Sequence, residues 1–161
     1  MLRQAVSRVT RRPALSRVPL RIPRRHLNIH EYQSAALMES KGVNVPFGVA
    51  VQTVEEAVKA AAEMGDEEVV IKSQILAGGR GLGTFTNGLQ GGVHIIKTSE
   101  VGEYASKMLG ETLVTKQTGP AGKPVSTLLL AKKMNLVNEM YFAILLDRVR
   151  SVSWLSVCIP D

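Results

Sequence analysis

The chain has 161 residues, 45% hydrophobic and only 4% aromatic, which is enough for one modest domain with an aliphatic core. Its net charge of +6 is uneven, because 8 of its 20 basic residues are arginines within the first 26 positions, where no acidic residue occurs. The remainder has 12 basic and 14 acidic residues, so we expect no nucleic-acid partner. No apolar run approaches the ~18 residues of a membrane span, so we expect no membrane partner either.

The basic leader, residues 1–26, precedes a more balanced sequence that begins at Leu27. An arginine-rich, acid-free and serine-containing start is typical of a mitochondrial transit peptide. Its apolar residues recur at helical spacing from Leu2 to Val9, before Pro13 interrupts the pattern. The alternative is a basic arm that binds nucleic acid or an anionic membrane surface, which the absence of interleaved aromatic residues disfavours.

After the leader, the pattern predicts alternating helices and strands. Asn28 with Glu31 forms a capping-box signature for a helix through about Ser40, and a strand is expected near Val49–Val51. Thr53 with Glu56 repeats the signature and starts a second helix that ends before Gly65. The later expected elements are a strand at Glu68–Lys72, a strand at Gly92–Lys97, a helix at Ser99–Leu109, and strands at Thr112–Lys116, Val125–Lys132 and Met140–Asp147. The order predicts a mixed α/β fold, of the α+β kind.

A glycine-dense segment separates two of these strands. Seven of the chain's 14 glycines lie in the 15 residues from Gly78 to Gly92, around Arg80 and just after Lys72. Glycine leaves backbone N–H groups uncovered, and arginine can make paired bonds to phosphate oxygens. The segment is no Walker A loop, and no helical pattern follows it, so we interpret it as a hairpin that closes over phosphate. A glycine-rich surface hairpin without a ligand is the alternative.

Five separated motifs carry a resemblance to a known family. They read LNIHEYQSAALMESKGVNVPFGVA, VVIKSQILAGGRGLGTF, GGVHIIK, LVTKQTGPAGKPV and LVNEMYFAILLDR, in unbroken order from Leu27 to about Arg148. Together they resemble the N-terminal part of the succinyl-CoA synthetase (succinate–CoA ligase) beta subunit, which is an ATP-grasp enzyme subunit.

The resemblance implies an ATP-grasp domain over residues 27–148. Residues 47–132 would form its first subdomain, and the flanks would belong to the second. It also implies that Lys72 binds the nucleotide phosphates, that Gly79, Arg80 and Gly81 form the phosphate-covering loop, and that Glu139 is an acidic residue at the nucleotide site.

The implied activity is that of a mitochondrial matrix ligase of the tricarboxylic acid cycle. Succinate, CoA and ATP or GTP would interconvert with succinyl-CoA through a phosphohistidine on an alpha subunit, with Mg²⁺ neutralising phosphate charge. No catalytic residue of this chain follows from the mapping. An acyl-CoA synthetase that acts on malate or citrate would share the same nucleotide motifs and stays an alternative.

The sequence departs from the family at three site positions. Many relatives have lysine in place of Leu82, and often in place of Gln90, so this loop is less cationic. Some relatives have a nucleotide-contacting glutamate where Ala131 stands, so any contact there must come from the backbone.

Residues 149–161 resemble nothing in the family, and we expect them to be a divergent tail. The family's Mg²⁺ ligands and the domain that faces the alpha subunit would then be missing. We expect the tail to leave Trp154, Leu155, Val157 and Ile159 without partner strands. The resulting alternative is a truncated, non-catalytic isoform with weak nucleotide binding, inactive when alone.

Overall fold

The computed structural model describes residues 28–137, 140–147 and 152–158. Its largest unit is a four-stranded sheet in the order β1-β7-β2-β4, built from β1 (Gly48–Val51), β2 (Glu68–Ser73), β4 (Val93–Lys97) and β7 (Leu128–Lys132). A smaller sheet has the order β3-β5-β6, from β3 (Thr84–Phe85), β5 (Thr112–Val114) and β6 (Lys123–Pro124). Every described strand pair is antiparallel, and helices accompany the sheets, which confirms the predicted α+β class.

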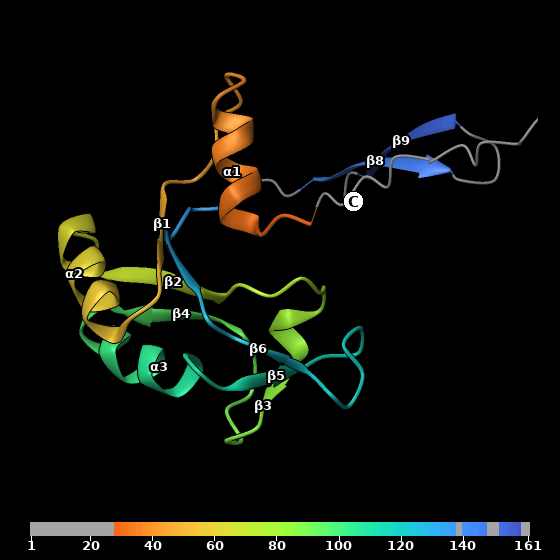
Figure 1. The fold of residues 1–161 in the computed structure, drawn as a ribbon. Helices are drawn as coiled ribbons and strands as arrows, with labels where there is room; N and C mark the ends of the chain where they lie inside the picture. Colours follow the sequence, from red (N-terminus) through yellow and green to blue (C-terminus); the bar gives the residue numbers. More distant parts are fainter. Residues whose placement is uncertain (1–27, 138–139, 148–151, 159–161) are drawn as a thin grey trace, which may run out of the picture.

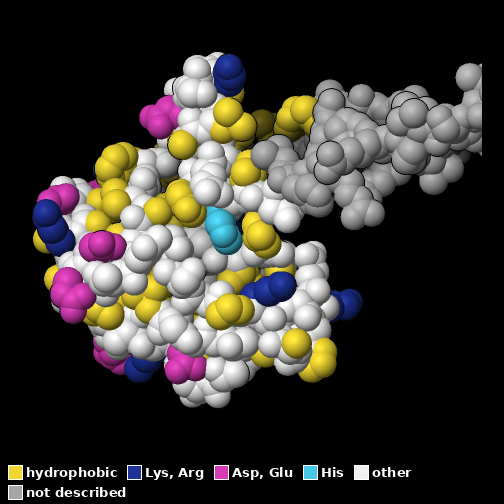
Figure 2. Space-filling view, in the orientation of Figure 1, with side chains coloured by type: hydrophobic (Ala, Val, Ile, Leu, Met, Phe, Trp, Pro, Cys, Tyr) yellow, Lys and Arg dark blue, Asp and Glu magenta, His cyan; other side chains and the backbone are white. Residues whose placement is uncertain are grey.

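Two helices cover one face of the large sheet (Figure 1). They are α2 (Val54–Met64) and α3 (Val101–Met108), the latter preceded by a 3-10 turn, η2 (Thr98–Glu100). The α2 helix begins as predicted, since Thr53 Oγ1 accepts a hydrogen bond from the Glu56 N–H, and it ends at Gly65, whose φ is 68°. Figure 2 shows acidic side chains gathered on the side of the molecule that carries these helices.

The hydrophobic core lies between these helices and the sheet. Strand β2 alternates buried and half-buried residues, as expected when one face is packed and the other is not. The core is made of aliphatic side chains with few aromatics, and its fully covered members include Ala57, Ala61, Val69, Ile71, Val101, Ala105, Met108, Leu128 and Leu130.

The first helix starts later than the sequence predicts. It is α1 (Glu31–Glu39), and its N-cap residue is His30 instead of Asn28. The predicted capping box fails because the Glu31 side chain reaches Lys72 and Arg80. Gln33 takes over the role that Glu31 was expected to play, and its Oε1 accepts a hydrogen bond of 2.8 Å from the His30 N–H.

Two predicted strands differ from the observed ones by two residues or more at one end. The strand expected at Thr112–Lys116 ends at Val114, because the Thr115 N–H donates to Thr118 Oγ1 in a turn. The strand expected at Val125–Lys132 begins later, as β7 at Leu128, and the buried Val125 lies between β7 and the short β6 of the other sheet. The chain therefore passes from the small sheet into the large one at this point.

The last described strands form a separate two-stranded sheet. Strand β8 (Tyr141–Asp147) pairs antiparallel with β9 (Val152–Cys158), with Ile144 opposite Leu155 and Leu145 opposite Trp154. The expectation that Trp154, Leu155 and Val157 lack a partner strand is therefore wrong. Ile159 and the leader, residues 1–26, lie outside the described residues.

Candidate functional site

The open face of the large sheet carries the predicted lysine. Lys72 lies opposite Leu129 on β7 and opposite Val93 on β4, so these three residues share one face. The next row along the same face places Val70 opposite Ala131. The α2 and α3 helices pack on the opposite face, and α1 lies over part of this one.

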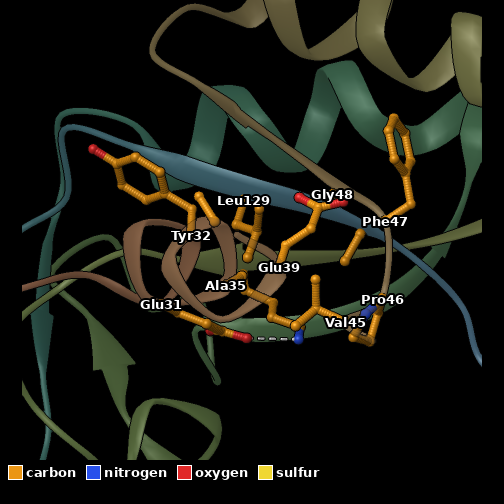
Figure 3. Close-up of a pocket in the computed structure, with 12 residues that line it drawn as sticks. Glu31, Tyr32, Ala35, Glu39, Val45, Pro46, Phe47, Gly48 and Leu129 are labelled. Atoms are coloured by element: carbon orange, nitrogen blue, oxygen red, sulfur yellow. Dashed lines mark hydrogen bonds and ion pairs between the residues drawn. The ribbon is translucent and has the colours of Figure 1, made fainter. Parts of the chain in front are cut away.

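A cavity of about 270 Å³ lies between α1 and this face (Figure 3). The α1 helix lies over the edge of the sheet at β1 and β7, and it supplies one wall of the cavity. Most lining residues are apolar or small, and the full set is Glu31, Tyr32, Ala35, Ala36, Glu39, Val45, Pro46, Phe47, Gly48, Lys72, Leu129 and Ala131. An apolar cavity with a few charged groups at its edge is the usual form of a small-molecule site.

Glu31 brings the two predicted cationic residues together. Its Oε1 accepts a hydrogen bond of 2.9 Å from Lys72 Nζ, which is the dashed line in Figure 3, and its Oε2 accepts one of 2.7 Å from Arg80 Nη2. All three side chains are partly covered, at 22–33% exposure. Three separate segments, α1, β2 and the glycine loop, therefore meet at one carboxylate.

The electrostatics of Glu31 follow from this contact. Burial raises the pKa of its carboxyl, but the hydrogen bonds and charges of Lys72 and Arg80 outweigh burial and hold the pKa below its ordinary value. The carboxylate is thus ionised at neutral pH, at a point where two cationic side chains converge.

Arg80 also closes the base of the glycine loop. It opens the 3-10 turn η1 (Arg80–Leu82), and its Nη1 donates to the Ser73 carbonyl at 2.7 Å. Ser73 Oγ donates to the Gly92 carbonyl, and the Gly92 N–H donates to the Arg80 carbonyl. The loop does connect two antiparallel strands, as predicted, but its base is tied by these bonds.

The upper part of the loop is open. Gly79 has a φ of 75°, and a Cβ added to it or to Gly81 would meet no atom within 4 Å. The Gly78 N–H is held by Gln117 Oε1 at 2.7 Å. Beside the loop lies a second cavity of about 310 Å³, lined by Gly81, Leu82, Gly83, Gln90, Gly91, Val93 and His94. Open space above glycines is what close approach of a ligand to the backbone requires.

Of the five predicted site residues, the structure brings Lys72 and Arg80 together, with Gly79 and Gly81 on either side of Arg80. Glu139 lies outside the described residues. Ala131 is buried and lines the first cavity, while Leu82 is 96% exposed. The residue roles remain predictions.

Sequence reasoning missed Glu31 and Gln117. The sequence indicates that Glu31 is a capping residue. Its contact with Lys72 and Arg80 could be predicted only by pairing a carboxylate in the first helical turn with cationic residues far away in the sequence. Gln117 lies 39 positions from Gly78, and no local sequence pattern predicts the hydrogen bond between them.

A metal site for the expected Mg²⁺ does not follow from these contacts. The described part of the chain holds no group of three or more His, Cys, Asp or Glu residues that could hold a metal ion. Glu31, whose carboxylate contacts the loop at Arg80, is already bound by two cations. Among the described helices, none is long and apolar enough to cross a membrane.

Comparisons with known proteins agree on one family. A profile described as "ATP-grasp domain" matches residues 28–157. The chain is 58% identical over 136 residues to the ADP-forming, mitochondrial succinate–CoA ligase subunit beta of Solanum lycopersicum, covering 83% of this chain and 33% of that protein. It is 59% identical over 136 residues to the subunit of that name from Arabidopsis thaliana, covering 83% and 32%. The GDP-forming, mitochondrial subunit of Sus scrofa is 44% identical over 149 residues, covering 92% and 34%. The chain thus spans about a third of the length of these curated relatives.

Proposed function

Because the chain belongs to the ATP-grasp domain family, we propose that it binds the phosphates of a nucleoside triphosphate between Lys72 and the glycine loop. The observation that carries this proposal is the convergence of Lys72 Nζ and Arg80 Nη2 on a single carboxylate, 2.9 and 2.7 Å away. A phosphate oxygen needs the same kind of donors. Gly79 and Gly81 leave room for it to approach the backbone.

The apolar cavity under α1 would hold the base and sugar of the nucleotide. It adjoins Lys72, and it is lined mostly by small and apolar side chains such as Ala35 and Leu129. Ala131 supplies only a methyl group there, so a polar contact at that position would come from the backbone. Relatives named both ADP-forming and GDP-forming are similar to this chain, so ATP and GTP are both candidate ligands.

The test of phosphate binding is the Lys72→Ala variant, with ATP as the probe in isothermal titration calorimetry. We expect binding to weaken by about 1.5–3 kcal/mol, the scale of hydrogen bonds to charged groups. Arg80→Lys should also weaken binding and is preferred to alanine, because Arg80 ties the loop to Ser73. Lys107→Ala on α3 is the control. Unchanged ATP affinity in folded Lys72→Ala and Arg80→Lys proteins would refute the proposal.

Within a complete enzyme, we propose that this domain serves the beta subunit of a succinate–CoA ligase. The relatives carry that name, and the chain shares 44–61% identity with the three mitochondrial plant subunits and the porcine one. The partner would be an alpha subunit that carries the phosphohistidine, and the substrates would be succinate and CoA. Lys72 and Arg80 would then hold the phosphates and absorb charge during phosphoryl transfer.

Nucleotide binding without turnover is the second candidate. The candidate site offers the cationic side chains of Lys72 and Arg80, but the described residues hold no group of three or more His, Cys, Asp or Glu residues that fits Mg²⁺, so no step is assigned to the metal here. The purified chain mixed with an alpha subunit, Mg²⁺, ATP, CoA and succinate should then form no succinyl-CoA above background. Turnover comparable to that of a complete beta subunit would refute this candidate.

The location we propose is the mitochondrial matrix. Several relatives are named mitochondrial, and the leader has eight arginines and no acidic residue before Leu27. We expect import followed by cleavage before about Leu27. N-terminal sequencing of protein from purified organelles tests this, and an intact Met1 would argue against it.

A further inference from the structure

We propose that Glu31 is an internal competitor for the phosphate site, and that arriving phosphates displace its carboxylate and release α1 from the sheet. The inference rests on the proposed nucleotide binding, and it assigns Glu31 a regulatory role in that same site. Glu31 is a positioning residue in this proposal, because it acts through Lys72 and Arg80 instead of through the nucleotide.

The Glu31 carboxylate binds both cationic side chains of the site at once. Each of its oxygens accepts a hydrogen bond from a different cation, Lys72 at 2.9 Å and Arg80 at 2.7 Å. These are the donors that a phosphate would use. A second anion placed against the same pair would meet a like charge at close range, which is unfavourable in a partly buried site. Phosphate and Glu31 therefore exclude each other at these donors.

Apart from these two ion pairs, α1 has few contacts that fix it to the rest of the fold. None of its nine residues is fully buried, and Leu37 and Met38 are about half exposed. The Tyr32 N–H also donates a long hydrogen bond of 3.4 Å to Oε1 of Gln74, the residue just after β2. A helix this short is marginal without tertiary contacts. Loss of the two ion pairs would therefore loosen the whole helix.

A movement of α1 would also change the cavity beneath it. The α1 helix supplies one wall of the cavity under it, through Tyr32, Ala35, Ala36 and Glu39. If phosphate frees Glu31, this wall moves in the same event. Binding of phosphate and access to the cavity are then coupled through one side chain.

The experiment uses inorganic tripolyphosphate, which lacks a base and a sugar, as the probe of the phosphate donors. We expect Glu31→Gln and Glu31→Ala to bind tripolyphosphate about 1.5- to 5-fold more tightly than the unchanged chain, because they remove a partly exposed anion that competes for the same donors. Glu103→Gln is the matched control, since it removes another helix ion pair of 2.7 Å, to Lys107 on α3, away from the site. The affinity of the Glu103→Gln variant for tripolyphosphate should be unchanged.

Amide hydrogen exchange over residues 31–39 reads out the release itself. We expect saturating tripolyphosphate to speed exchange in the unchanged chain, and the Glu31 variants to exchange fast without it. Unchanged or weaker binding by both Glu31 variants, or α1 amides that stay protected at saturation, would overturn the proposal. If Lys72→Ala still weakens ATP binding in that case, nucleotide binding stands and only the competitor role fails.

Discussion

The two faces of the large sheet differ in what covers them, although the same strands supply both. Toward α2 and α3, Ile71 and Leu130 are fully buried. Toward α1, Ile95 is 59% exposed and Lys72 is bound to a single glutamate. Strand alternation places Ile71 and Lys72 on opposite faces although they are one position apart along the chain.

The difference separates stability from binding. Burial of aliphatic side chains is the main favourable term in folding, so the covered face holds most of the stability. The open face keeps cationic donors and a cavity under one lightly attached helix. A ligand can therefore rearrange α1 without disturbing the core, and substitutions on the two faces should have different effects.

The largest expected effect is on the covered face. Leu130→Ala should lower the free energy of unfolding by about 2–5 kcal/mol, because it leaves a cavity between the sheet and its helices. Ile95→Ala on the open face should cost less than about 1 kcal/mol, since that side chain is already largely in water. Urea denaturation of both variants measures the comparison. Equal losses would show that the open face is as important for stability as the core.

The base of the glycine loop comes next. A Cβ on Gly92 would lie 2.6 Å from Leu113 Cδ2 and closer still to Ser73 Oγ, whereas a Cβ on Gly81 would meet nothing within 4 Å. We expect Gly92→Ala to cost about 1–3 kcal/mol through overpacking, and Gly81→Ala to change stability by less than about 0.5 kcal/mol. Thermal unfolding distinguishes them. A harmless Gly92→Ala would mean that the base of the loop is not tightly closed.

A smaller effect is expected at the start of α2. Thr53→Ala removes the side chain that accepts from the Glu56 N–H, which should cost about 1 kcal/mol. Ser106→Ala is the control, because its hydroxyl bonds a carbonyl of its own helix at the exposed surface. Urea denaturation of the two variants should separate them, and a loss confined to Ser106→Ala would contradict the capping role.

The smallest effect is a dependence on pH carried by Glu31. Its pKa is lower in the folded chain than the ordinary value of 4.5. Its contribution to stability is therefore fully present above about pH 4.5 and is lost as pH falls through the folded-state pKa. The difference in stability between the unchanged chain and Glu31→Gln should shrink between pH 6 and pH 3. A difference that grows on acidification would contradict the lowered pKa.

Capping residues and apolar periodicity predicted much of this fold, but they could not predict contacts between residues far apart in the sequence. The α2 helix begins after Thr53 and ends at Gly65, as the sequence indicates, because capping depends on residues three or four positions apart. The pairing of Lys72 with Glu31 joins residues 41 positions apart, and it overrode the local capping pattern at Asn28. The short β6 and the start of β7 at Leu128 also escaped prediction, since an apolar run does not show where the chain passes from one sheet to the other.

The bond between Gln117 and Gly78 makes the loop at residues 115–122 an adjustable support for the glycine loop. That loop leads through β6 into β7, so it is anchored to the large sheet a few residues later. Changes in its length or in Gln117 would shift where the Gly78 N–H points without touching Lys72 or Arg80. Related chains could thus retune the loop from a distance while keeping the same cationic residues.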